Sequence, residues 1–319
     1  MSVLGASLMP PIRQRPDAIG KGLVEWGDSW HLWAMTKTLL SFGHGFSARA
    51  LTNLLVPQGW RVIGTTRSAE KADALAASGV APLVFPGSDV GEALADATHL
   101  LISAGPDADG DPVLREVGAQ IAARAPSFEW AGYLSTTGVY GDHQGGWVDE
   151  NAALTPATRR GRWRVDAEAA WAAIPGLPLH IFRLAGIYGP GRGPFAKVRS
   201  GTARRIIKEG QVFSRIHVDD IAQVVAASIA RPNPGAVYNV CDNDPAPPQD
   251  VIGHAAELLG LPLPPALDFE TAEMTPMARS FYAESKRVRN ERIKDELGVS
   301  LLYPTYREGL AALLAEETD

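Results

Sequence analysis

From residue 35 onward, the chain alternates between two hydrophobic patterns. Short apolar runs predict buried strands, and apolar residues that recur every three or four positions predict helices. Strands are predicted at residues 38–42, 59–67, 80–85, 99–104, 130–135 and 179–184. Helices are predicted directly after the first strand and at residues 69–78, 89–96 and 161–174. This alternation predicts an α/β fold, a doubly wound parallel sheet (Rossmann) with helices on both faces. Ligands of such sheets bind at the carboxyl ends of the strands.

Polar residues at the predicted helix starts are typical of N-caps. Ser68 precedes the helix of residues 69–78, and Asp111 followed by Pro112 indicates a cap and a first helical residue. Side-chain oxygens at such positions accept hydrogen bonds from the free N–H groups of the first turn. Further on, Asp219 and Asp220 are predicted to cap a helix that ends near residue 230.

The sequence pattern changes after residue 188. A loop rich in glycine and proline, residues 189–194, leads into short basic and apolar pieces. A strand at residues 236–241 and two final helices near 287–297 and 305–315 follow. We therefore predict a Rossmann domain at residues 35–190 and a small C-terminal substrate lobe at residues 191–319 that is intertwined with the sheet.

The first 34 residues do not resemble the rest of the fold. They carry three prolines and three tryptophans and lack the basic start and sustained apolar core of a signal peptide. We expect translation to begin at Met35. The alternative is a real extension that packs its tryptophans on the domain.

Composition limits the range of functions. The 319 residues, 45% of them hydrophobic, carry a net charge of −6 and a pI of about 5.7. This charge does not favour nucleic acid or a membrane surface as the main partner. The single cysteine, Cys241, excludes an internal disulfide framework and fits a reducing cytoplasm. No metal-ligand spacing is present, so no metal is expected.

A glycine-rich turn follows the first predicted strand. Gly43, Gly45 and Ala48 have the spacing G-x-G-x-x-G/A. The first glycine allows a tight turn, the second lets a pyrophosphate approach the backbone, and the small third residue lets helix and strand pack closely. The N-terminus of the helix then offers free N–H groups to the phosphates. Alone the pattern is weak, because a glycine turn without a ligand has the same spacing.

The end of the second strand indicates which dinucleotide binds. NAD-binding Rossmann domains place an acid about 20 residues after the glycines, where it holds the ribose 2′-hydroxyl. Here Arg67 follows that strand and Lys71 lies one turn further on. An arginine pairs with a 2′-phosphate, so NADP is predicted over NAD. The alternative is an ordinary solvated residue at the end of a strand.

Three further stretches carry a family resemblance. Residues 134–141 (LSTTGVYG) resemble the strand-five signature of sugar-nucleotide epimerases. Residues 183–191 (RLAGIYGPG) resemble the strand-six signature of the same proteins. Residues 215–222 (RIHVDDIA) are similar to the segment that precedes a helix of their C-terminal lobe. With the glycine turn they resemble the short-chain dehydrogenase/reductase superfamily, in its extended and atypical branch of NAD-dependent epimerase/dehydratase-like proteins. The resemblance runs from residue 35 to the end.

This resemblance implies positions for a cofactor. It places Gly43, Gly45, Phe46, Ser47 and Ala48 along the pyrophosphate and Arg67 at the adenosine phosphate. The other implied cofactor residues follow the fourth and sixth strands: Ser103, Ala104, Gly105, Ala185, Gly186 and Ile187.

The chain departs from the family at the catalytic pair. Members use Tyr-x-x-x-Lys, in which the tyrosine exchanges a proton with the substrate oxygen. The matching positions here are Arg160 and Arg164. Arginine stays charged and cannot move a proton, although Arg164 can hold the ribose hydroxyls. The resemblance places Thr136 where it can hydrogen-bond a substrate oxygen, and Tyr140 is the candidate that would protonate it.

Three hypotheses about the function remain. The first is an NAD(P)-dependent oxidoreductase or epimerase/dehydratase-like enzyme, with Thr136, Tyr140 and Arg164 as its catalytic residues. Its small-molecule substrate would be an anion if the arginines at residues 159–164 bind it. The second is a non-catalytic redox sensor or regulatory protein that binds NADP(H). The third is a structural subunit that has lost the cofactor. A monomer and a homodimer are both compatible with the sequence.

Overall fold

The computed structural model describes residues 37–317. The predicted extension of residues 1–34 lies outside this range. A seven-stranded parallel sheet runs through the described part in the order β11-β7-β5-β4-β1-β2-β3. Its strands are β1 (Thr38–Phe42), β2 (Arg61–Thr66), β3 (Ala81–Val84), β4 (His99–Ile102), β5 (Trp130–Thr136), β7 (Leu179–Leu184) and β11 (Val237–Val240). This confirms the predicted doubly wound α/β fold.

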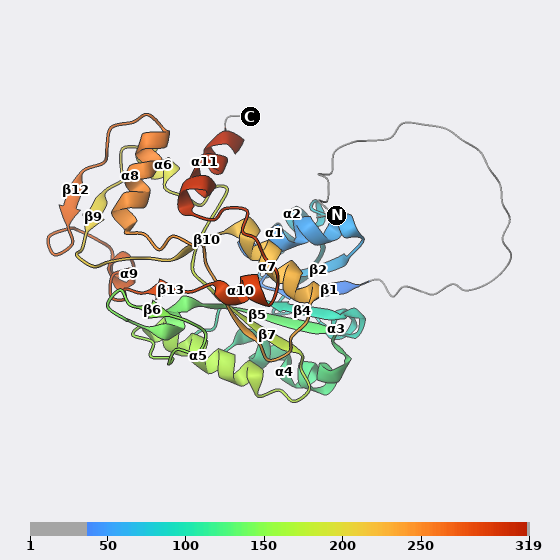
Figure 1. Cartoon of the computed structure of the whole chain (residues 1–319). Helices are drawn as coiled ribbons and strands as arrows, with labels where there is room; N and C mark the ends of the chain where they lie inside the picture. The colour runs from blue at the N-terminus through green and yellow to red at the C-terminus, as the bar shows by residue number, and fades with distance from the viewer. Residues whose placement is uncertain (1–36, 318–319) are drawn as a thin grey trace, which may run out of the picture. The chain divides into compact units, whose positions relative to one another are not determined.

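Alternate residues of the strands face two separate cores. Leu39 of β1 packs in a cluster with α1 (Phe46–Leu55), α2 (Glu70–Ala76) and α7 (Val218–Ala230). Leu40 and Phe42 face the opposite cluster. That cluster includes α3 (Gly91–Asp96), α4 (Pro112–Arg124) and α5 (Arg159–Ala172). Helices therefore cover both faces of the sheet (Figure 1).

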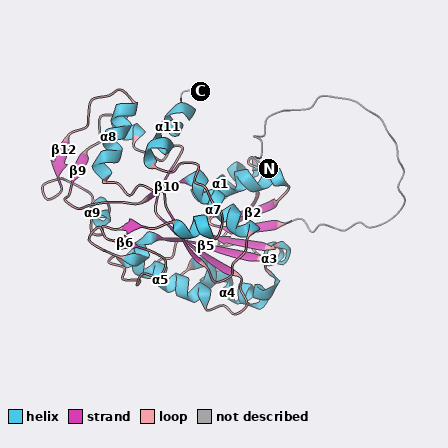
Figure 2. Ribbon diagram, in the orientation of Figure 1, coloured by secondary structure: helices cyan, strands magenta, loops and turns pink. Residues whose placement is uncertain are grey.

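Three two-stranded parallel sheets lie outside the main sheet (Figure 2). They pair β6 (Trp147–Val148) with β13 (Arg287–Val288), β8 (Gly186–Tyr188) with β10 (Arg215–His217), and β9 (Arg205–Ile207) with β12 (Ala266–Asp268). The remaining helices are α6 (Phe195–Arg199), α8 (Pro248–Leu258), α9 (Pro276–Phe281), α10 (Glu291–Asp295) and α11 (Tyr306–Glu316). Buried residues of α6, α8 and α11 form a third core.

The second half of the chain completes the Rossmann core. Strand β11 forms the edge of the main sheet beside β7. Helix α7 packs against α1, and Ile221 and Val225 of α7 share a core with Leu51 of α1. The described residues accordingly form one compact unit. The domain boundary at residue 190 stays a prediction.

One of the three predicted caps is confirmed. The Asp111 Oδ1 atom accepts hydrogen bonds from the N–H groups of Val113 (2.9 Å) and Leu114 (3.1 Å). Ser68 is not a cap, because α2 begins at Glu70 and its N-cap position is Ala69.

The predicted cap by Asp219 and Asp220 is also wrong. His217 caps α7 and its Nδ1 atom accepts from the Asp219 N–H. The buried Asp220 carboxylate instead accepts from the N–H groups of Leu302 and Tyr303.

Candidate functional site

The glycine turn lies at the carboxyl edge of the sheet, between β2 and β4. The Gly43 N–H donates to Thr65 Oγ1 (2.8 Å) and the His44 N–H to the Thr65 carbonyl (3.0 Å). Gly43 has a φ of +78°, and a Cβ atom there would lie 2.7 Å from the Ala104 nitrogen. Only glycine fits this position, because the turn touches the backbone that follows β4.

The start of α1 is uncapped and unobstructed. Gly45 occupies the N-cap position, where no side chain caps the helix, and the first turn holds no acidic residue. A Cβ atom on Gly45 would approach only the Gly43 carbonyl oxygen, at 3.7 Å. Open space therefore lies over free N–H groups at the positive end of the helix dipole, which is the environment that a phosphate group requires.

The segment after β4 supports the turn with a side chain. The Ser103 hydroxyl donates to the Gly43 and Phe42 carbonyls, and the N–H groups of Ser103 and Ala104 donate to Phe42 as well. Gly105 is exposed at the same edge. The structure thus brings together Gly43, Ser103 and Ala104. The hydrogen bonds of the Ser103 hydroxyl stabilise the turn.

Arg67 projects from the end of β2 into solvent. It is exposed, and no ion pair or side-chain hydrogen bond holds it within residues 37–317. Lys71 is exposed as well, and the acids nearest in sequence, Glu70 and Asp73, belong to the first turn of α2. The Arg67 guanidinium is free to bind an anion at this edge.

The space between β5, β7 and α5 holds a buried polar network. Glu168 accepts from Ser135 Oγ (2.5 Å) and from Arg183 Nη2 (2.8 Å). Arg183 Nη1 donates to the Tyr140 hydroxyl (3.0 Å), which in turn donates to Asn239 Oδ1 (2.7 Å). This network ties three strands and a helix together beneath the site. Arg183 opens the strand-six signature, but no sequence pattern indicates that it pairs with Glu168.

Tyr140 is therefore part of the core. Its side chain is fully buried and both hydrogen-bonding functions of its hydroxyl are engaged. Burial raises the pKa of Tyr140 to about 12, although the Arg183 charge opposes this rise. The geometry offers no support for a proton-transferring role of this residue, which stays a prediction from the sequence.

Arg164 spans the carboxyl ends of β4 and β5. Its Nη1 atom donates to the Leu134 carbonyl (2.8 Å) and to the Tyr133 hydroxyl (3.1 Å). Its Nη2 atom would lie 3.3 Å from a Cβ atom on Gly105. The half-buried guanidinium is thus held beside the segment that follows β4, whereas Arg160 is exposed on the first turn of α5.

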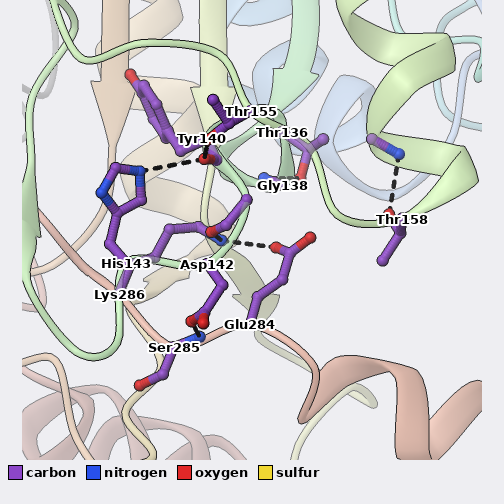
Figure 3. Close-up of polar contacts among 12 residues, drawn as sticks. Thr136, Gly138, Tyr140, Asp142, His143, Thr155, Thr158, Glu284, Ser285 and Lys286 are labelled. Carbon is purple, nitrogen blue, oxygen red and sulfur yellow. Dashed lines mark hydrogen bonds and ion pairs between the residues drawn. The ribbon is translucent and has the colours of Figure 1, made fainter.

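Thr136 ends β5 with its hydroxyl facing the next turn (Figure 3). Thr136 Oγ1 accepts from the Gly138 N–H (3.1 Å), and within the described residues its own proton has no acceptor. The side chain is half-buried. Thr136 can therefore donate a hydrogen bond to a ligand oxygen.

A buried ion pair lies beside this segment, and no sequence pattern indicates it. Lys286 Nζ donates to the Gly141 carbonyl (2.7 Å) and to Glu284 Oε2 (2.7 Å), and the side chains are 10% and 12% exposed (Figure 3). Asp142 accepts from the Ser285 N–H (2.8 Å). Residues 284–286 therefore fasten the C-terminal part of the chain to the loop that follows Tyr140.

The remaining predicted cofactor residues follow β7, the sheet neighbour of β5. Ala185 is buried and its N–H donates to the Val240 carbonyl (3.0 Å). Gly186 is exposed, Ile187 is half-buried, and both belong to β8. The sheet order places this segment next to Thr136.

Two negative findings bear on the site. Among the described residues, no group of three or more His, Cys, Asp or Glu side chains could hold a metal ion. In the same part of the chain, no helix is long and apolar enough to cross a membrane.

These features define a class: a Rossmann protein with a glycine turn at the first strand. No family model matches the chain. It is 30% identical over 285 residues to Protein YeeZ of Escherichia coli strain K12, an alignment that covers 84% of this chain and 97% of that protein. A solved structure from Silicibacter pomeroyi, described as a conserved protein of unknown function, is 67% identical with a TM-score of 0.86 and covers 88% of this chain and 99% of its own.

Two more distant structures have a similar fold. A candidate NAD-dependent epimerase/dehydratase from Methylobacillus flagellatus is 26% identical with a TM-score of 0.68, covering 90% of this chain and 100% of its own. The human epimerase family protein SDR39U1, solved with NADPH, is 18% identical with a TM-score of 0.68, covering 87% and 99%. This chain belongs to the short-chain dehydrogenase/reductase superfamily, among the atypical NAD-dependent epimerase/dehydratase-like proteins.

Proposed function

We propose that the protein binds a nicotinamide dinucleotide at the carboxyl edge of its sheet. The observation that carries this proposal is the open, uncapped start of α1 above the Gly43 turn. Gly43, Gly45 and the N–H groups of residues 46–48 would hold the pyrophosphate. Ala104 and Gly105 would border the cofactor at β4, and residues 185–187 would border the nicotinamide. SDR39U1 has a similar fold and was solved with NADPH, which supports a nicotinamide dinucleotide as the ligand.

The part of the site that would bind the adenosine end of the cofactor favours NADP. Arg67 is an exposed cation at the end of β2 without an ion-pair partner in the described part of the chain. A guanidinium pairs with a 2′-phosphate through charge-assisted hydrogen bonds. NAD, which lacks that phosphate, would gain nothing from this contact.

We further propose an oxidoreductase or epimerase/dehydratase-like activity. The bound cofactor supplies or accepts a hydride. Arg164, fixed by Leu134 and Tyr133 beside Gly105, would orient the cofactor ribose. Thr136 would donate a hydrogen bond to a substrate oxygen.

The activity would depend on charge stabilisation, and the proton that the substrate oxygen gains or loses on hydride transfer would be exchanged with solvent water instead of with a side chain. Neither Arg160 nor Arg164 releases its proton near neutral pH, and the Tyr140 hydroxyl is buried and engaged. Fixed positive charge and the Thr136 donor can stabilise negative charge that develops on a substrate oxygen. An anionic, oxygenated small molecule suits the arginines at the start of α5.

A redox sensor is the second candidate function. It is favoured by one observation: Arg160 stands at the position of the family's proton-donating tyrosine, and the Tyr140 hydroxyl that could replace it is buried. A sensor would bind NADP(H), would turn over no substrate, and would recognise a partner in only one redox state.

Thr136→Ala separates the two functions. Carbonyl compounds and sugar nucleotides are screened by the absorbance of NADPH, and binding of NADPH is measured in parallel. For an enzyme, Thr136→Ala is expected to lower turnover by about tenfold or more while NADPH affinity stays unchanged. Thr155→Ala is the matched control, because the Thr155 hydroxyl is engaged by the Tyr140 carbonyl (2.8 Å). If no compound is turned over and a partner protein binds only one redox form, the sensor is the correct function.

A further inference from the structure

Arg160 lies on the side of α5 that faces the sheet. The buried residues of the helix define this side: Gly161, Ala167, Glu168 and Trp171. Each residue of an α-helix turns about 100° around the axis, so Arg160 lies about 40° from Arg164, which is one turn further on. The Arg164 guanidinium meets the end of β5 at the Leu134 carbonyl (2.8 Å). Arg160 therefore shares a helix face with a side chain that contacts the sheet.

Arg160 also lies level with the last residue of β5. Helix α5 connects the carboxyl end of β5 to the start of β7, and these two strands are parallel, so α5 runs antiparallel to both. From Arg164 back to Arg160 the helix advances by about 6 Å. From Leu134 to Thr136 the strand advances by about 7 Å in the same direction. Arg160 is thus expected at the level of Thr136.

The contacts of the first turn of α5 agree with this level. A Cβ atom on Gly161 would lie 2.8 Å from the Gly138 carbonyl oxygen. The Gly138 N–H in turn donates to Thr136 Oγ1 (3.1 Å). Figure 3 shows this segment beside Thr158, the N-cap of α5. Arg160 is the chain neighbour of Gly161, so its backbone lies next to the hydroxyl that is free to bind a substrate oxygen.

The Arg160 guanidinium has no partner among the described residues. Arg160 is exposed, and it makes no ion pair and no side-chain hydrogen bond within residues 37–317. Two other arginines of the helix are engaged: Arg159 lies 5.2 Å from the centroid of the Trp163 ring, and Arg162 donates to the Ala157 carbonyl (3.4 Å). The first turn holds no acid. Arg160 faces the sheet side and is nevertheless exposed, so the space beside its charge is open to a ligand.

We infer that Arg160 is a substrate-binding residue that selects a carboxylate next to the reacting oxygen. The inference rests on the proposed function and names its substrate class, which is 2-oxo acids and the corresponding 2-hydroxy acids. A guanidinium binds a carboxylate through two parallel hydrogen bonds, while Thr136 donates to the oxygen on the adjacent carbon. One unpaired guanidinium matches the single charge of a carboxylate.

Reduction of such an acid needs one hydride and one proton. The carbonyl carbon accepts the hydride of NADPH and the carbonyl oxygen takes a proton from water, so a hydroxy acid and NADP⁺ are formed. Arg160 stays protonated throughout, because its pKa lies far above neutral pH. It binds and orients the substrate and takes no part in the bond changes.

Two pairs of ketones test the inference. The acids 2-oxobutanoate and 2-oxohexanoate are compared with butanone and 2-hexanone, in which a methyl group replaces the carboxylate. Reduction is followed by the absorbance of NADPH, and binding to the protein saturated with NADP is measured by calorimetry. The wild type is expected to prefer the acids. Arg160→Gln is expected to raise the KM and the Kd of the acids about tenfold to a hundredfold, because a charge-assisted contact is lost, while kcat and NADPH affinity change by less than about twofold.

Two further variants serve as controls. Arg160→Lys keeps the charge but loses the two parallel hydrogen bonds, so a smaller rise in KM is expected. Arg162→Gln is the matched control, because it removes an exposed arginine about 200° away on the same helix. It is expected to bind and reduce the acids as the wild type does. A melting temperature of each variant near that of the wild type shows that the fold is intact.

The outcomes separate this inference from the proposed function. Arg160 is only a solvated surface cation if Arg160→Gln binds the acids as the wild type does, or if Arg162→Gln loses as much affinity. The same follows if a wild type that binds NADPH shows no preference for the acids over the ketones. In these cases the proposed dinucleotide site stands. A wild type that binds no NADPH would overturn the proposed function, and this inference with it.

Discussion

At the scale of single residues, the site differs from its family by a few side chains with firm structural reasons. The tyrosine that follows β5, Tyr140, is a buried link between Arg183 and Asn239, and the family's proton-donating tyrosine is replaced by Arg160. The lysine position on α5 carries Arg164, which binds the end of β5. Among the described residues, Thr136 and Arg67 are two side chains that remain free to meet a ligand.

Tyr140→Phe tests the structural role of this hydroxyl. The change leaves Asn239 Oδ1 and an Arg183 N–H without their partner in the core, so the free energy of unfolding is expected to fall by about 1–3 kcal/mol. Affinity for NADPH is expected to stay unchanged. Urea unfolding and calorimetry measure the two quantities. Unchanged stability together with abolished turnover would instead support the catalytic role predicted from the sequence.

His99 makes the stability of the fold depend on pH. It is buried against Trp60, and burial, assisted by the nearby Lys37 charge, lowers its pKa from 6.5 to about 4. The unfolded histidine binds a proton below pH 6.5, whereas the folded one does so only near pH 4. Lowering the pH through this window therefore favours the unfolded state.

His99→Phe keeps a ring but removes the titration. Through this group, the free energy of unfolding of the wild type should fall by up to about 1.4 kcal/mol per pH unit as the pH is lowered from 6.5 to 4. The fall in the variant should be smaller by this amount. Urea unfolding at several pH values gives the difference between the two proteins. A difference that does not change with pH would show that His99 is not the titrating group.

At the scale of elements, much of the fold could be predicted and most of the small strands could not. Hydrophobic periodicity is local, so it located the strands of the main sheet and most helices to within a few residues. Strands β6 and β13 are short and pair residues about 140 positions apart, Trp147 with Arg287, and no local pattern encodes such a contact. The role of Asp220 was missed for the same reason, since its carboxylate accepts hydrogen bonds from the distant Leu302 and Tyr303 N–H groups.

The site could be predicted only where backbone geometry dictates residue type. The Gly43 turn needs a positive φ and a close approach to Ala104, so its glycines are visible in the sequence. The contact of Lys286 with the Gly141 carbonyl needs only that two distant segments meet.

Asp111→Ala tests an element that the sequence identified correctly. Removing the cap of α4 leaves the N–H groups of Val113 and Leu114 without an acceptor, and the free energy of unfolding is expected to fall by about 1 kcal/mol. Asp166→Ala, an exposed acid within α5, is the control and should change it by less than about 0.5 kcal/mol. Equal effects of the two changes would contradict a capping role.

At the scale of the whole molecule, the two halves of the chain share one core. Strand β11 and helix α7 come from the second half, yet they complete the sheet and cover α1. The loop of residues 189–194 joins the halves and also lies on the start of α1. The segments that would bind a cofactor and those that would bind a substrate therefore pack on one shared core.

A fragment that ends at residue 190 is expected not to fold alone. Without β11 and α7 it would expose Leu51 and Phe182, which are buried in the full chain, and burial of such side chains supplies most of the driving force for folding. Circular dichroism and thermal melting of the fragment measure this. A cooperative melt near that of the full chain would show that the halves are independent domains.

The central claim is that a dinucleotide binds over the start of α1, and Gly45→Val tests it most directly. The new side chain would meet little of the protein, since a Cβ atom there approaches only the Gly43 carbonyl oxygen, and it would fill the space that the pyrophosphate needs. Gly118→Val on α4 is a matched control away from the turn.

Calorimetric titration of the wild type and both variants with NADP and NADPH is the decisive measurement. The account predicts binding by the wild type and by Gly118→Val, and none by a folded Gly45→Val protein. Binding by Gly45→Val equal to that of the wild type, or no binding by the wild type, would contradict it.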